Sequence, residues 1–77
     1  MHWLIVPKNH MSCFRDGQCD EKVLGHLFGK VSEIAKLAGI AEDGFRIVVN
    51  TGDDGGQTVM HFHTHLLGGR FMEWPPG

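Results

Sequence analysis

The sequence predicts an α+β domain in which one main helix packs on an antiparallel sheet. Two observations carry this prediction. A single amphipathic segment lies in the middle of the chain, and shorter apolar or β-branched runs lie on both sides of it. A chain of 77 residues is too short for two independent cores, so residues 1–77 are expected to form one domain.

Composition narrows the possible function classes. The net charge is -2 with neutral histidines, and no basic cluster occurs, so nothing indicates binding to nucleic acid. No apolar run reaches the length of a membrane-spanning helix, and the chain does not open with a signal-peptide pattern. We therefore expect no membrane partner and a cytoplasmic location, with the nucleus as a second one. Cys13 and Cys19 lie at no zinc-binding spacing and are expected to be reduced thiols.

The first expected strand is the apolar run Trp3–Val6, which ends at Pro7. Because the run is continuously apolar, we expect a strand buried on both faces. Residues 9–20 mix Ser, Gly, Asp and Asn, a composition typical of a loop. Asp20 is expected to cap the following helix, because its carboxylate can accept hydrogen bonds from the first free helical N–H groups.

The predicted helix follows Asp20 and ends near Gly39. Its apolar residues recur at steps of three and four, which places them on one stripe of a helix. They are Val23, Leu24, Leu27, Phe28, Val31, Ile34, Ala35 and Ala38.

A β-hairpin is predicted in the second half of the chain. Phe45–Asn50 is apolar and β-branched, residues 51–56 read TGDDGG, and Gln57–Leu67 supplies the returning strand. With the first strand, this hairpin completes the antiparallel sheet on which the helix is expected to lie.

Histidines occupy every second position in "QTVMHFHTHLLGG". In a strand, His61, His63 and His65 project to one face, with neighbouring Cα atoms roughly 6.6 Å apart. In a helix, they would splay around the axis at about 200° steps. The strand therefore aligns three imidazoles on one face. That face also carries Val59 and Leu67, and the helix-packed face carries Met60, Phe62 and Leu66.

A glycine-rich turn leads into the histidine row. Gly56, Gln57 and Thr58 directly precede it, and glycine lets backbone N–H groups approach an oxyanion closely. The turn could therefore hold a phosphate beside the histidines. The alternative is that its glycines only satisfy the positive φ angles of a turn.

Two other interpretations of the histidines remain open. A metal ion could be shared by two strand histidines, with His2 or His10 completing the site, although the strand has no cysteine or carboxylate at a ligand spacing. A purely structural row is less favoured, because three buried imidazoles would need partners for six nitrogens. We expect neither a metal nor another cofactor.

The amino-acid sequences of several segments resemble those of one protein family. "HFHTHLL" resembles the alternating signature of the histidine triad (HIT) family, although Thr64 is polar at a position that is usually apolar. "HWLIVPKNH", "GFRIVVNTGDDGGQTV" and "LLGGRFMEWPPG" resemble its nucleotide-binding branch, the purine nucleoside phosphoramidases. The similarity runs along essentially the whole chain and is weakest between residues 11 and 21.

This resemblance implies a HIT-like fold and a hydrolase that cleaves P–N bonds of AMP-amine or GMP-amine type substrates. By the same resemblance, His63 is the nucleophile and forms a nucleotidyl-histidine intermediate. His65 lies by the phosphate and leaving group, and His61 supports the nucleophile. Positions that match substrate-binding residues of the family are Asn50, Gly56, Gln57, Thr58, Thr64 and Leu4. The tail around Trp74 matches a segment that crosses toward the partner in a homodimer.

The resemblance covers only the later part of a HIT domain. The chain begins at a position similar to the fourth strand, so the strand that carries the family's ribose-binding acidic residue has no counterpart here. Residues 1–77 are accordingly expected to form one partial HIT domain. Whether this chain is an active enzyme or a catalytically impaired binding or regulatory module is left open by the sequence.

Overall fold

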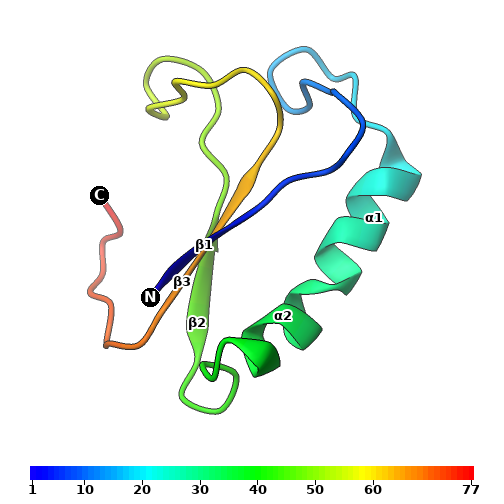
Figure 1. The fold of residues 1–77 in the computed structure, drawn as a ribbon. Helices are drawn as coiled ribbons and strands as arrows, with labels where there is room; N and C mark the ends of the chain where they lie inside the picture. The colour runs from blue at the N-terminus through cyan, green and yellow to red at the C-terminus, as the bar shows by residue number, and fades with distance from the viewer.

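Two layers make up the chain: a three-stranded antiparallel sheet and a helical segment along one of its faces (Figure 1). The computed structural model describes all residues from 1 to 77. Its elements are β1 (His2–Ile5), α1 (Glu21–Gly29), α2 (Val31–Leu37), β2 (Phe45–Val48) and β3 (Thr64–Gly68). The predicted α+β class is confirmed.

Strand β3 is the centre of the sheet, whose order is β1-β3-β2. Both neighbours run antiparallel to it, and His65 pairs with Leu4 on one side and Val48 on the other. Strand β1 is an edge strand with three of its four residues exposed. The expectation that this strand is buried on both faces is therefore wrong, because an apolar run reports side-chain type and not how many neighbours the strand acquires.

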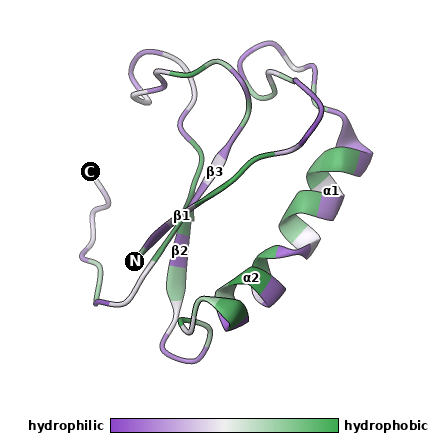
Figure 2. Cartoon of the chain, viewed as in Figure 1, coloured by the Kyte–Doolittle hydropathy of each residue, from purple (hydrophilic) through white to green (hydrophobic).

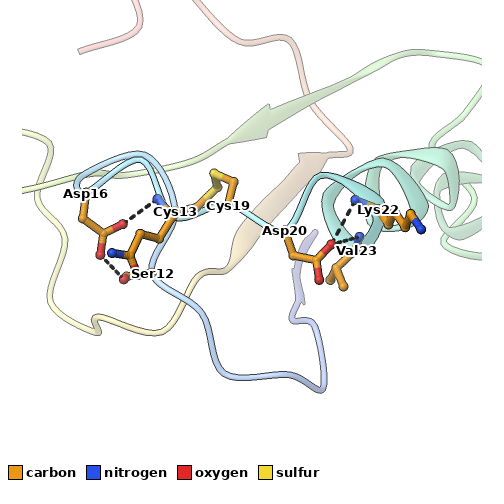
Figure 3. The surroundings of a disulfide bond; sticks show 8 residues. Ser12, Cys13, Asp16, Cys19, Asp20, Lys22 and Val23 are labelled. Carbon is orange, nitrogen blue, oxygen red and sulfur yellow. Dashed lines mark hydrogen bonds between the residues drawn. A yellow bond between two sulfur atoms is a disulfide. The ribbon is translucent and has the colours of Figure 1, made fainter.

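The helical segment begins where the sequence predicts. Oδ1 of Asp20 accepts hydrogen bonds from the backbone N–H groups of Lys22 at 3.0 Å and Val23 at 3.2 Å (Figure 3). These bonds satisfy two amides that the first turn would otherwise leave free. Lys30 interrupts the segment and separates α1 from α2, so the single predicted helix is divided in two. Neither helix is long and apolar enough to cross a membrane.

The end of α2 is determined by Gly39. Its φ of 77° is a left-handed conformation that glycine adopts without strain. The N–H of Gly39 donates to the Lys36 carbonyl at 3.1 Å, and the N–H of Ile40 donates to the Ala35 carbonyl at 3.0 Å. This is a Schellman arrangement, which satisfies carbonyls that the helix end would leave free.

The core lies between the helices and the sheet and consists of two clusters of buried side chains. One comprises Met11, Cys13, Leu27 and Phe62, and the other Val31, Ala35, Ile40 and Leu66. Polar and apolar residues alternate along both helices, as expected for helices with one buried face (Figure 2). Each cluster contains a residue that neighbours a histidine in the chain, so the core anchors the histidine segment at two points.

The returning strand is shorter than predicted. The sequence predicts it over Gln57–Leu67, but regular pairing begins only at Thr64. Before that point, the Phe62 N–H donates to the Met11 carbonyl at 2.7 Å, which draws the segment toward the loop after β1. The alternation of faces nevertheless persists from His61 onward: odd-numbered residues are half-buried and even-numbered ones are buried. Met60, expected in the core, is 48% exposed.

The two cysteines form a disulfide bond, with Cα atoms 4.4 Å apart (Figure 3). The expectation of two reduced thiols is therefore wrong. The N–H of Gly17 donates to the Cys13 carbonyl at 3.0 Å, and this turn brings Cys19 back to Cys13. Cysteine spacing does not reveal such a turn, which is why the sequence does not predict the pairing.

Candidate active site

His63 is oriented by a backbone carbonyl. Its Nδ1 lies 2.9 Å from the carbonyl oxygen of His61. A carbonyl can only accept a hydrogen bond, so Nδ1 carries the proton and donates it. In the neutral ring, Nε2 then keeps its lone pair. The local chain path thus presents His63 in the tautomer that a nitrogen nucleophile requires.

His61 has both ring nitrogens engaged. Nδ1 accepts a hydrogen bond from the Met11 N–H at 3.4 Å, so Nε2 carries the proton and donates to the Pro7 carbonyl at 3.1 Å. The ring of His10 stacks on it, with centroids 4.8 Å apart and an interplanar angle of 18°. These contacts hold the backbone at residue 61, whose carbonyl orients His63. Both ring nitrogens of His61 are therefore hydrogen-bonded within the chain, whereas Nε2 of His63 is not.

His65 is bonded to a fourth histidine. Its Nδ1 lies 2.8 Å from Nε2 of His2, and either ring can be the donor. The His65 ring also meets that of His63 edge to face, with centroids 5.1 Å apart. Burial, followed by the nearby His63 and His2 imidazoles, lowers the pKa of His65 below its ordinary value of 6.5. Each cause disfavours the protonated ring, which therefore gives up its proton readily.

Two hollows meet at His63. An apolar hollow of about 220 Å³ is lined by Leu4, Val6, Val59, His61 and His63. A second, narrow crevice is lined by polar and hydrophobic residues in nearly equal numbers. It includes Arg15, Asn50, Thr51, Gln57, Met60 and His63. His63 thus belongs both to an apolar hollow and to a mixed crevice that contains the cationic Arg15.

The turn before the histidines supplies fewer free amide donors than predicted. The Gly56 N–H donates to the Asp53 carbonyl and the Gln57 N–H to the Gly52 carbonyl, each at 3.0 Å. These two groups close the turn and are not free for an anion, so the predicted nest is corrected. The amide of Thr58 makes no hydrogen bond within the chain, and its side chain is exposed. Thr58 is the remaining donor of the three.

Gln57 braces this turn with its side chain. Its Oε1 accepts from the Gly52 N–H at 2.9 Å, and its Nε2 donates to the Val59 carbonyl at 3.2 Å. Gly55 permits the tight turn, because a Cβ there would clash with the Thr51 carbonyl oxygen and lie 2.8 Å from its nitrogen. The turn is therefore a rigid support beside the crevice.

The structure brings three of the six predicted substrate-binding residues to His63, whereas Gly56, Thr58 and Thr64 line neither of its hollows. Leu4, Asn50 and Gln57 share a hollow with His63. Thr64 does not, because it is fully buried on the opposite face and its hydroxyl has no hydrogen-bond partner. Alternation of side chains along the strand places residue 64 in the core, so its side chain has no access to a substrate on the histidine face.

Sequence reasoning missed the supporting role of four residues: His2, Pro7, His10 and Met11. The sequence indicates His2 and His10 only as possible metal ligands, whereas in the structure they contact His65 and His61. Composition was the available signal, since five of the six histidines lie in this one network. No three His, Cys, Asp or Glu side chains are grouped so as to hold a metal ion.

Several known proteins are similar to this chain. An uncharacterized HIT-like protein of Synechococcus elongatus is 46% identical over 78 residues, and a 14 kDa zinc-binding protein of Zea mays is 44% identical over 79. These alignments cover 100% and 99% of the chain but only 68% and 61% of the relatives.

Solved structures agree with the sequence relatives. The HIT family hydrolase of Legionella pneumophila superposes with a TM-score of 0.88 at 41% identity, over 99% of this chain and 69% of that protein. A hypothetical histidine triad nucleotide-binding protein of Sulfolobus tokodaii gives 0.67 at 29% identity, over 87% of this chain and 45% of that protein. Residues 1–72 match the HIT domain, and the chain belongs to the HIT domain family.

Proposed function

We propose that the chain is a nucleotide-binding histidine triad hydrolase that cleaves the P–N bond of purine nucleoside phosphoramidates. The observation that carries this proposal is the hydrogen bond from Nδ1 of His63 to the His61 carbonyl, because it leaves the Nε2 lone pair free on a residue that lines both hollows. Nε2 attacks the α-phosphorus, the P–N bond breaks and the amine departs with a proton. Water then displaces Nε2 and releases the nucleoside monophosphate.

The two hollows that share His63 support a nucleotide ligand. The hollow of Leu4, Val6 and Val59 offers apolar contacts to a base or ribose, and the crevice with Asn50 and Gln57 offers polar contacts. The Sulfolobus tokodaii neighbour described as nucleotide-binding supports a ligand of this class. We propose AMP-like or GMP-like substrates for the chain.

His65 is proposed to supply the proton that the leaving amine needs. A positioned general acid contributes roughly 10²- to 10⁴-fold to such a step. The lowered pKa of His65 makes its protonated form a stronger acid, and His2 is within hydrogen-bond distance to exchange a proton with it. The activity is therefore expected to fall when either ring is removed.

The test is turnover of an adenosine 5′-phosphoramidate by the chain and by His63→Ala, with His26→Ala as a matched control on the exposed face of α1. We expect His63→Ala to lose turnover and His26→Ala to keep it. Intact-mass analysis during turnover should show an adenylyl adduct that is absent from His63→Ala. Equal turnover by His63→Ala would remove this function.

The second candidate function is that of a binding or regulatory module without catalysis. The exposed edge of the sheet at β1 favours this function. Strand β1 and the residue after it expose Trp3, Leu4 and Val6 by 46%, 59% and 49%. An apolar edge of this kind pairs readily with another chain, and we propose a homodimer. Sedimentation equilibrium with an activity assay separates the candidates: a dimer that binds AMP without turnover identifies the module. Either form is proposed to act in the cytoplasm and the nucleus.

A zinc site fits these residues poorly. His2 and His65 are the nearest pair of nitrogen donors, but they are hydrogen-bonded to each other at 2.8 Å, and no third ligand is grouped with them. The name of the Zea mays relative describes that protein. No step of the proposed reaction is assigned to a metal.

A further inference from the structure

The loop between Cys13 and Cys19 carries a cation toward the candidate site. The disulfide closes this loop, and Gly17, with a φ of 72°, makes its turn (Figure 3). Cys13 is only 4% exposed and belongs to the same core cluster as Phe62. Arg15 therefore projects from a short loop that is fastened at both ends.

The guanidinium of Arg15 has no partner within the chain. The other two arginines do: Arg46 donates to the Glu73 carbonyl at 3.2 Å and Arg70 to the Phe71 carbonyl at 3.1 Å. No carboxylate lies within ion-pair distance of Arg15, since the one ion pair of the chain joins Lys30 and Glu33. Arg15 is thus a free cation with five N–H donors.

The adjacent carboxylate is turned to other partners. Asp16 accepts hydrogen bonds from the Ser12 hydroxyl at 2.5 Å and from the Gln18 N–H at 2.9 Å (Figure 3). These bonds lower the pKa of Asp16, so it remains ionised but is occupied by the loop itself. The Asp16 carboxylate is therefore hydrogen-bonded within the loop, and the Arg15 guanidinium has no partner there.

Arg15 lines the same crevice as His63, Asn50 and Gln57. The loop is also attached directly to the histidine segment. The Phe14 ring meets Phe62 edge to face with centroids 5.8 Å apart, and Met11 bonds to both His61 and Phe62. The backbone of the loop that carries Arg15 is therefore attached to the histidine segment through Met11 and Phe14.

We propose that Arg15 binds an oxyanion of the substrate beside His63. This inference rests on the proposed function and adds a specificity-determining residue to it. The guanidinium matches phosphoryl and carboxylate oxygens equally well, because both present paired acceptors to its planar N–H groups. The oxyanion is either the phosphoryl group under attack or a carboxylate on the leaving amine, and these two sources can be separated by substrate choice.

The experiment compares the unmodified chain with Arg15→Ala, Arg15→Lys and Lys36→Ala. Lys36 is an exposed cation on α2, so its removal matches the change in net charge. Each protein is measured for AMP binding and for kcat/KM on two adenosine 5′-phosphoramidates. One has glycine as leaving amine and the other glycinamide, which lacks the carboxylate.

A phosphoryl contact predicts that Arg15→Ala weakens AMP binding and lowers kcat/KM on both substrates about tenfold or more, as expected for a lost charged hydrogen bond. A leaving-group contact predicts that only the glycine substrate is affected. Arg15→Lys should retain part of either effect, and Lys36→Ala should behave like the unmodified chain.

The inference is overturned if Arg15→Ala matches the unmodified chain in every measurement, or if Lys36→Ala produces the same losses. If the unmodified chain hydrolyses neither substrate, the proposed function fails by itself. The AMP-binding comparison then decides about Arg15: weaker binding in Arg15→Ala supports the phosphoryl contact, and unchanged binding removes the inference.

Discussion

Thr64→Val is expected to stabilise the fold. The side chain of Thr64 is fully buried between the sheet and the helices, and its Oγ1 has no hydrogen-bond partner. A buried hydroxyl that loses water without gaining a partner costs about 1–3 kcal/mol. Valine has nearly the same shape and replaces the hydroxyl with a methyl group that needs no partner, so we expect the free energy of unfolding to rise by about 1–3 kcal/mol.

The measurement is guanidinium denaturation followed by far-UV circular dichroism. The midpoint should increase while the slope with denaturant stays unchanged, because the same surface is exposed on unfolding. In thermal unfolding, each 1 kcal/mol corresponds to roughly 4–8 °C in Tm for a domain of this size.

Thr64→Ser is the matched control, since it keeps the unpaired hydroxyl and removes only the methyl group. It should be less stable than the unmodified chain by about 1 kcal/mol. If Thr64→Val is equally stable or less stable than the unmodified chain, the hydroxyl has a partner and the reasoning fails. Because residue 64 faces away from His63, turnover should not change in the valine variant.

Three further predictions concern the pH response and the packing of the sheet. In NMR titrations, His2→Ala should move the pKa of His65 back toward 6.5, because one of the charges that lowers it is removed; an unchanged titration would contradict the role of His2. Since the folded chain binds a proton at His65 less readily than the unfolded chain, His65 contributes stability that is fully present above pH 6.5 and is lost as the pH falls toward the lowered pKa. Gly68→Ala should destabilise the chain by about 1–3 kcal/mol through overpacking, because its Cβ would lie 2.7 Å from Cδ1 of Ile40. The loss should be smaller in an Ile40→Val background, and equal losses in both backgrounds would show that the two residues do not compete for space.

The local signals of the sequence were sufficient for the outline of the fold. Asp20 and Gly39 bound the helical segment in the structure as predicted, since capping and left-handed φ depend on a residue and its immediate neighbours. The row of alternate histidines also follows from the chain itself, because side chains alternate along any extended segment. The interruption at Lys30 and the late start of β3 have no comparable local signal.

The proton positions and hydrogen-bond partners of the histidine rings depend largely on residues far away in the chain. The proton positions follow from the Pro7 carbonyl and the Met11 amide on His61, and from the His61 carbonyl on His63. The partner of His65 is His2, 63 positions earlier. None of these contacts has a periodic signal in the sequence, and the high number of histidines indicates a network without identifying its partners.

The sequence by itself determined that three imidazoles share one face of an extended segment, and that this segment belongs beside a helix on an antiparallel sheet. Only the tertiary structure decided which nitrogen of His63 is free, which turn amides are already bonded, and that an unpaired guanidinium shares the crevice. The physical reason is the difference in sequence separation between the interactions involved. Backbone periodicity acts between neighbouring residues, whereas hydrogen-bond partners are assigned when distant segments pack together.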